Sequence, residues 1–230
     1  MKLTSRERAK GAFEWFRRER PVVETELHYG SSFEFLVAVV LSAQCTDVRV
    51  NMITPALFRR FPTPFAMKEA QEEEVFELIS SVTYPHSKAR HLIALSKILA
   101  EEHEGKVPET FKELVKLPGV GQKTANVILS VLYKEPAIAV DTHVYRVSHR
   151  LGLVTSRDNT PPKVEAKLMR VVPNEYLDNA HHWLLLHGRY ICKARKPECD
   201  RCGLTAICRF YAKLQVVSVK KKSSEESPAI

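Results

Sequence analysis

The sequence predicts an all-α protein, and three observations support this class. Apolar residues recur at helical spacing in one stretch after another, the two-residue alternation of β-strands is almost absent, and Pro and Gly fall between the periodic stretches. The composition, 44% apolar and 27% charged in 230 residues, is that of a globular protein and excludes collagenous and disordered classes. The length suits one large domain or two small ones.

The first half of the chain begins with two helices whose starts are visible in the sequence. Thr4 or Ser5 can cap a first helix that ends near Arg18, because a hydroxyl accepts a hydrogen bond from a backbone N–H of the first turn. A second helix is expected over residues 32–44, and its continuous apolar run predicts burial on all sides. Further helices are expected over residues 47–60, 72–82 and 87–104, the last of them ended by Gly105.

The second half continues with short helices over 110–117 and 122–133. The stretch after Pro136 can be interpreted as a strand, but we favour a helix that Asp141 caps and that ends near Arg150. The remaining helices are expected over residues 163–172 and 176–190. Residues 215–230 lose the apolar periodicity and gain Lys, Ser and Glu, which predicts a disordered tail.

Four of the five cysteines are gathered in the pattern C-x6-C-x2-C-x5-C, formed by Cys192, Cys199, Cys202 and Cys208. Because no signal peptide is visible, we expect a reducing, intracellular compartment, where such clustering indicates a metal site rather than disulfides. Four thiolates suit a tetrahedral zinc ion or a [4Fe-4S] cluster. Only one pair has the short spacing of a zinc knuckle, which favours the cluster, although spacing alone leaves zinc open.

The charge balance favours a polyanionic partner. Lys and Arg total 35 against 27 Asp and Glu, a net charge of +8, and nucleic acid is the leading candidate. Lys193, Arg195 and Lys196 lie between the first two clustered cysteines and could contact phosphates, or could form a merely solvated loop. No apolar run of about 18 residues indicates a membrane span. We therefore expect a cytoplasmic protein without a membrane partner.

The turn within residues 117–125 contains two of the eight glycines, Gly119 and Gly121. Glycine permits positive φ and close approach of a ligand, and the helix that follows offers free N–H groups at its positive end. A phosphate is the natural ligand of such a turn. The alternative is a plain corner between two helices, and the spacing is not that of a nucleotide-binding P-loop.

Lys123 and Asp141 each stand at the start of an expected helix. The helix dipole disfavours a cation in the first turn, so Lys123 is either a solvated lysine near phosphate or an amine that acts as a nucleophile in Schiff-base chemistry. Asp141 can be a simple N-cap, which the local sequence favours. A capping carboxylate can also take part in catalysis, so the two roles are compatible.

With the glycine turn, Asp141 and the cysteine pattern in this order, the chain resembles the endonuclease III family, bifunctional DNA glycosylases of the helix-hairpin-helix superfamily. The resemblance runs from about Thr25 to Lys213 and includes residues 41–47, 181–192 and 194–199. It implies two α-helical domains on either side of a DNA-binding cleft. A six-helix barrel with the helix-hairpin-helix would span 25–135, and residues 1–24 and 136–214 would form an iron–sulfur domain.

The resemblance also implies roles for particular residues. Lys123 would attack C1′ of a flipped, oxidised pyrimidine nucleotide and expel the base, while Asp141 would stabilise the developing positive charge and assist proton transfer. The Schiff base then permits β-elimination and strand cleavage 3′ to the lesion. The four cysteines would ligate a [4Fe-4S] cluster, Gly119 and Gly121 would present N–H groups to a phosphate, and Gln44 would fill the gap left by the extruded base.

One segment departs from the family pattern. Where the family usually has Gly followed by Leu or Ile, in a loop that wedges into the duplex, this chain has Thr83 and Tyr84. Tyr84 would then be the wedge, and Pro85 is expected to hold it in extended backbone conformations. The alternative is a half-exposed loop aromatic.

These observations together predict a monomeric, nucleoid-associated base-excision repair glycosylase and AP lyase that acts on damaged double-stranded DNA. Adenine mismatch glycosylases of the same superfamily lack the hairpin lysine, whereas this chain has Lys123. The alternative from another class is a non-catalytic DNA-binding protein with a structural zinc site.

Overall fold

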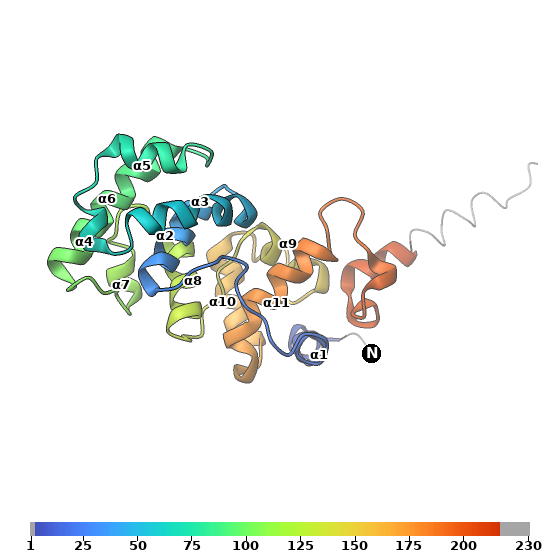
Figure 1. Cartoon of the computed structure of the whole chain (residues 1–230). Coiled ribbons are helices and arrows are strands. Elements are labelled where there is room, and N and C mark those ends of the chain that lie inside the picture. The colour runs from blue at the N-terminus through green and yellow to red at the C-terminus, as the bar shows by residue number, and fades with distance from the viewer. Residues whose placement is uncertain (1–2, 217–230) are drawn as a thin grey trace, which may run out of the picture. The chain divides into compact units, whose positions relative to one another are not determined.

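A computed structural model describes residues 3–216 of the chain (Figure 1). Its regular structure within that range is entirely helical, which confirms the all-α class. The strand considered after Pro136 is not formed, because residues 137–140 are irregular and lead directly into a helix capped by Asp141. Residues 209–216 are helical, so the expectation that the disordered tail begins at residue 215 is wrong there, and the rest of the predicted tail lies outside the described residues. No helix in the described range is long and apolar enough to span a membrane.

The chain divides into two compact units, each with its own hydrophobic core. One unit runs from Thr25 to Pro136, and the other combines the residues up to Glu24 with those from Ala137 on. The second unit therefore joins segments from both ends of the chain. One such contact is the hydrogen bond that Trp183 Nε1 donates to the Arg20 carbonyl oxygen, at 2.8 Å.

The unit from Thr25 to Pro136 is built around helix α2. Its helices are α2 (Ser32–Ser42), α3 (Asp47–Arg60), α4 (Pro64–Met67), α5 (Glu72–Ile79), α6 (Pro85–Glu102), α7 (Phe111–Leu114) and α8 (Gln122–Leu132). Residues Phe33 and 35–41 of α2 are all buried, as the continuous apolar run predicted, and α2 contacts α3, α6 and α8. Fully burying one large apolar side chain contributes about 1.5–3 kcal/mol, so the buried residues of α2 contribute substantially to the stability of this unit.

The expected helix ends are mostly correct. The 32–44 helix stops at Ser42, however, and the 72–82 helix stops at Ile79. The helix expected from residue 87 begins two residues earlier, at Pro85, since proline is well suited to the first helical position. The one-turn helix α4 was not predicted, because four residues are too few to show a helical period.

The other unit contains α1 (Ser5–Glu19), α9 (Thr142–Leu151), α10 (Pro161–Val171), η1 (Asn174–Tyr176), α11 (Leu177–Tyr190), η2 (Cys199–Arg201) and η3 (Thr205–Ile207). Thr4 caps α1, as predicted, in a reciprocal capping box with Glu7. Helices α9 and α11 approach closely at Gly188, where an added Cβ would lie 2.8 Å from the Cβ of His143. The segment that contains the four cysteines follows directly after α11.

Candidate functional site

The glycine turn joins α7 to α8, and its two glycines stand in different situations. Gly119 has φ of +81°, and a Cβ there would lie 3.1 Å from the Cβ of His91, so the fold itself requires glycine. Gly121 is the N-cap of α8 with φ of −91°, a conformation open to any residue, and nothing lies within 4 Å of an added Cβ. Space is therefore left for an external group to approach the backbone at Gly121.

Lys123 is the second residue of α8 and its side chain is exposed. The first turn of α8 contains no acidic residue, and its N-cap provides no side-chain hydrogen bond. A cation at the positive end of a helix dipole does not stabilise the helix. The position of Lys123 is thus explained better by a ligand outside the helix than by the fold.

Asp141 is the N-cap of α9 and is half-buried. Its Oδ1 accepts a hydrogen bond of 2.7 Å from the Val144 N–H. The capping role is therefore correct, and it holds the carboxylate in one orientation. Lys123 belongs to the unit from Thr25 to Pro136 and Asp141 to the other. The catalytic role of Asp141 stays a prediction.

Gln44 and Tyr84 are both exposed and both have left-handed backbones, with φ of +56°. The expectation of an extended Tyr84 is wrong: its ψ is +53°, and it is the N-cap of α6. The chain must reverse sharply between α5 and α6, and in this conformation the Tyr84 carbonyl accepts the first hydrogen bond of α6, from Lys88 N–H at 3.0 Å. Such a conformation costs on the order of 1–3 kcal/mol and persists only where the surroundings enforce it.

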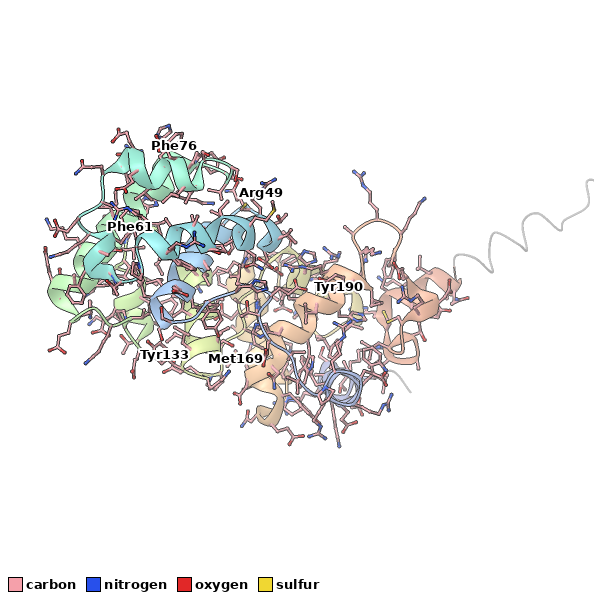
Figure 2. All side chains as sticks on the ribbon, in the orientation of Figure 1. Arg49, Phe61, Phe76, Tyr133, Met169 and Tyr190 are labelled. Atoms are coloured by element: carbon pink, nitrogen blue, oxygen red, sulfur yellow. The ribbon has the colours of Figure 1, made fainter. Side chains whose placement is uncertain are left out.

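Next to Tyr84, the start of α6 is held by a ring contact. Phe76 of α5, labelled in Figure 2, stacks on His86 with ring centroids 4.0 Å apart. Tyr84 itself is 63% exposed, so its ring is not needed for the core. Tyr84 is thus exposed rather than half-exposed, and its role as a wedge stays a prediction.

Lys88, for which the sequence predicted no role, is buried in the first turn of α6. Its Nζ donates hydrogen bonds to the carbonyl oxygens of Leu41 and Ala43, at 2.8 and 2.7 Å. Burial lowers the pKa of the Lys88 amine, and nearby Cys45 opposes that shift. The signal in the sequence was the one that drew attention to Lys123, a lysine in a first helical turn.

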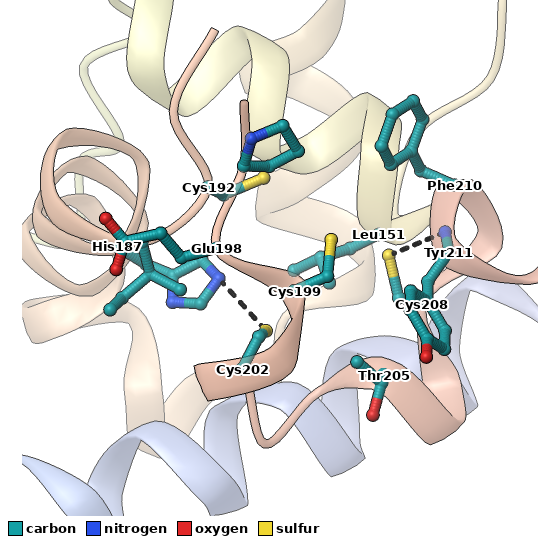
Figure 3. Close-up of a pocket in the computed structure, with 12 residues that line it drawn as sticks. Leu151, His187, Cys192, Glu198, Cys199, Cys202, Thr205, Cys208, Phe210 and Tyr211 are labelled. Carbon is teal, nitrogen blue, oxygen red and sulfur yellow. Dashed lines mark hydrogen bonds between the residues drawn. The ribbon is translucent and has the colours of Figure 1, made fainter. Parts of the chain in front are cut away.

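The four clustered cysteines line one pocket (Figure 3). Cys192 follows the end of α11, Cys199 opens η2, and Cys202 and Cys208 are the C-caps of η2 and η3. His187 and Phe210 belong to the same lining. Segments separated along the chain thus bring the four thiols to one place, as the spacing predicted.

Three of the four sulfur atoms have a nitrogen within hydrogen-bonding reach. Arg150 Nη1 lies 3.4 Å from Cys192 Sγ, His187 Nε2 lies 3.7 Å from Cys202 Sγ, and the Tyr211 N–H donates to Cys208 Sγ at 3.5 Å. Burial lowers the pKa of His187 to about 4, with a smaller effect from the Arg20 charge, so its imidazole is neutral near pH 7.

The cysteines also influence one another. Burial raises the pKa of the Cys199, Cys202 and Cys208 thiols, and the neighbouring cysteines raise it further. Neighbouring thiolates repel one another, and a positively charged metal centre would offset that repulsion. Within residues 3–216, no three His, Cys, Asp or Glu side chains are grouped so as to hold a single metal ion. In a [4Fe-4S] cluster each iron takes one cysteine, so this donor set does not have to converge on one ion.

The basic loop between Cys192 and Cys199 is anchored at its start. Arg150 donates to the carbonyl oxygens of Lys193 and Ala194, at 2.7 and 3.0 Å, and its guanidinium lies 4.6 Å from the Phe210 ring centroid. Lys193 forms an ion pair with Glu198, which also pairs with Arg201. All three basic residues are exposed, but Lys193 is engaged by Glu198, so Arg195 and Lys196 are better placed for phosphate contacts.

A protein whose regular structure over residues 3–216 is helical, with a glycine hairpin and a four-cysteine pocket, has the features of a base-excision DNA repair protein. Residues 37–174 match the HhH-GPD superfamily of base excision DNA repair proteins. Endonuclease III of Rickettsia conorii is 49% identical over 88% of this chain and 96% of its own length. Endonuclease III of Escherichia coli K12 is 45% identical over 87% of this chain and 94% of its own length.

A solved structure supports the same relationship. A trapped endonuclease III–DNA covalent intermediate, an estranged-adenine complex, has a TM-score of 0.86 and 41% identity, covering 93% of this chain and 100% of that one. The chain belongs to the endonuclease III family, which confirms the resemblance seen in the sequence. It is therefore an enzyme of base excision repair, a DNA glycosylase.

Proposed function

We propose that this glycosylase is bifunctional and that it removes oxidised pyrimidines from damaged double-stranded DNA and then cleaves the strand. The Lys123 amine attacks C1′ of the extruded nucleotide, and the bond from C1′ to the base breaks as the base leaves. The amine and the opened sugar form a Schiff base, and β-elimination then breaks the C–O bond 3′ to the lesion. Hydrolysis of the imine frees the lysine.

The observation that carries this proposal is the exposed Lys123 in the first turn of α8, directly after the hairpin. Helix stability does not account for a lysine at that place, and Lys123 forms no ion pair with any residue of the described range 3–216. The related endonuclease III was solved as a covalent intermediate with DNA, which is what a nucleophilic side chain would produce.

Other residues would assist by contacting the sugar and the phosphates of the DNA. The Asp141 carboxylate, oriented by the Val144 N–H, would stabilise positive charge on the sugar as the base leaves. The backbone at Gly121 would bind a phosphate, and Arg195 and Lys196 would add charge contacts. We expect a monomer that works on the nucleoid in the cytoplasm.

We further propose that Cys192, Cys199, Cys202 and Cys208 ligate a [4Fe-4S] cluster. The four thiols line one pocket, neighbouring cysteines raise the pKa of the Cys199, Cys202 and Cys208 thiols, and a nitrogen lies within hydrogen-bonding reach of three of the sulfur atoms. When bound, such a cluster would act as a rigid crosslink between α11 and the segments around η2 and η3. Arg150 would then hold the basic loop against that fixed support.

The test of the proposed function is borohydride trapping, which reduces the imine to a stable covalent complex. Lys123→Gln should lose trapping and nearly all strand cleavage while it still binds DNA, because an amide cannot form an imine. Lys116→Gln is the matched control, since it removes the same charge from an exposed position of the same hairpin. Trapping of Lys123→Gln at the wild-type level would refute the nucleophile.

A further inference from the structure

Two loops of the unit from Thr25 to Pro136 present an exposed residue in a left-handed conformation. Gln44 lies between α2 and α3, and Tyr84 lies between α5 and α6. The resemblance to the endonuclease III family implies that both residues enter the duplex. Neither residue is glycine, so each backbone needs contacts that enforce its conformation.

The first set of contacts comes from Lys88. Its buried amine reaches from α6 to the end of α2 and donates to the carbonyl oxygens of Leu41 and Ala43. These carbonyls have no partner within a helix that ends at Ser42, and a cationic group suits the negative end of the α2 dipole. Lys88 thereby fixes the start of α6 relative to the end of α2.

The second contact is more local and lies at the surface. Thr83 Oγ1 donates a hydrogen bond of 2.8 Å to the carbonyl oxygen of Gln44, which is 39 residues away in the sequence. Thr83 directly precedes Tyr84, so this bond joins the backbone of one exposed left-handed residue to the neighbour of the other. The Thr83 side chain is exposed and takes no part in the core.

We propose that Thr83 is a positioning residue that holds Gln44 and Tyr84 in one preset arrangement for entry into the duplex. The inference rests on the proposed function, and it assigns to Thr83 a role in base extrusion rather than in the chemistry. An arrangement formed before binding lowers the ordering entropy lost when two side chains enter the helix stack. The benefit should be felt where a base must be extruded, and not at an abasic site, where no base is present.

The experiment compares two duplexes under single-turnover conditions, one with thymine glycol paired with adenine and one with an abasic site. Thr83→Val keeps the shape of the side chain but loses the donor, and it should slow removal of thymine glycol by about three- to tenfold. The rate of cleavage at the abasic site should change less than about twofold, which is the effect expected from the loss of one weak surface contact. Thr83→Ser keeps the hydroxyl and should restore the wild-type rate on both duplexes.

Ser80→Ala is the matched control. Ser80 lies in the same loop, but its hydroxyl donates to the Glu77 carbonyl oxygen of its own helix, at 3.2 Å, so both rates should stay at the wild-type level. In the free protein, amide hydrogen exchange over residues 43–46 should be faster in Thr83→Val than in Ser80→Ala.

Wild-type rates in Thr83→Val, equal slowing on both duplexes, or failure of Thr83→Ser to restore the rate would each overturn the positioning role while leaving the proposed function in place. A wild-type protein inactive on both duplexes would overturn the proposed function, and this inference with it.

Discussion

Asp141 shows how one side chain can serve the fold and the reaction. Its Oδ1 accepts the Val144 N–H, which completes the first turn of α9. A capping carboxylate held in this way cannot rotate freely, so any charge it offers to a sugar is offered from one direction. The structural and catalytic roles of Asp141 can be separated, because asparagine caps helices about as well as aspartate.

We expect Asp141→Asn to retain the stability of the protein but to slow base removal by about 100-fold or more, since it deletes charge stabilisation specific to the transition state. Asp141→Ala should show the same loss of rate and, in addition, a destabilisation of about 0.5–2 kcal/mol from the lost cap. Single-turnover kinetics and thermal unfolding measure the two effects. An unchanged rate in Asp141→Asn would reduce Asp141 to a cap.

In the α7–α8 hairpin, the fold requires one glycine, Gly119, whereas a ligand would account for the other, Gly121. Gly119 has positive φ and would contact His91 if it had a side chain, whereas Gly121 has an ordinary conformation and open space around it. Only Gly119 is therefore explained by the protein alone. Gly121 is explained if another molecule approaches the start of α8.

Substitution by alanine distinguishes the two glycines. Gly119→Ala should destabilise the protein by about 1–3 kcal/mol, because of its left-handed φ and the close contact with His91. Gly121→Ala should change stability by less than about 1 kcal/mol but weaken binding to abasic-site DNA about tenfold, because the methyl group would hold a phosphate away from the N–H groups. Thermal unfolding and a binding isotherm for each variant provide the check. Unimpaired binding by Gly121→Ala would show that no phosphate lies there.

The two units of the chain have separate hydrophobic cores. The cysteine pocket belongs wholly to the unit that combines both ends, and three of its cysteines pack against that core, namely Cys192, Cys202 and Cys208. A cluster that links these segments should therefore stabilise this unit and leave the core around α2 unaffected.

We expect purified protein to contain about four iron atoms per chain. Cys199→Ser should lower the iron content and speed amide hydrogen exchange in α9 and α11, while exchange in α2 and α8 stays slow. Cys45→Ser, in the other unit, is the control and should retain its iron. Stoichiometric zinc without iron, in protein produced with adequate iron, would instead favour a structural zinc site.

The helices, their caps and the cysteine pocket were predictable because their determinants are local. The capping residues Thr4 and Asp141, the apolar run of α2 and the cysteine spacing each lie within a few residues of the structure they specify. The glycine hairpin was visible for the same reason. The family could be identified because these local features occur in a particular order along the chain.

The details that depend on distant residues could not be predicted. Several features depend on contacts between segments far apart in the sequence. They are the Thr83–Gln44 hydrogen bond, the buried Lys88 at the end of α2, the left-handed Tyr84 and the neutral His187 beside Cys202. No periodicity encodes such a contact, because it forms only when packing brings two elements together and removes water from between them. The class of protein and its candidate chemical groups could therefore be predicted from the sequence. How the two exposed loops are held depends on the tertiary structure, because hydrogen bonds from Thr83 and Lys88 reach residues about 40 positions away in the sequence.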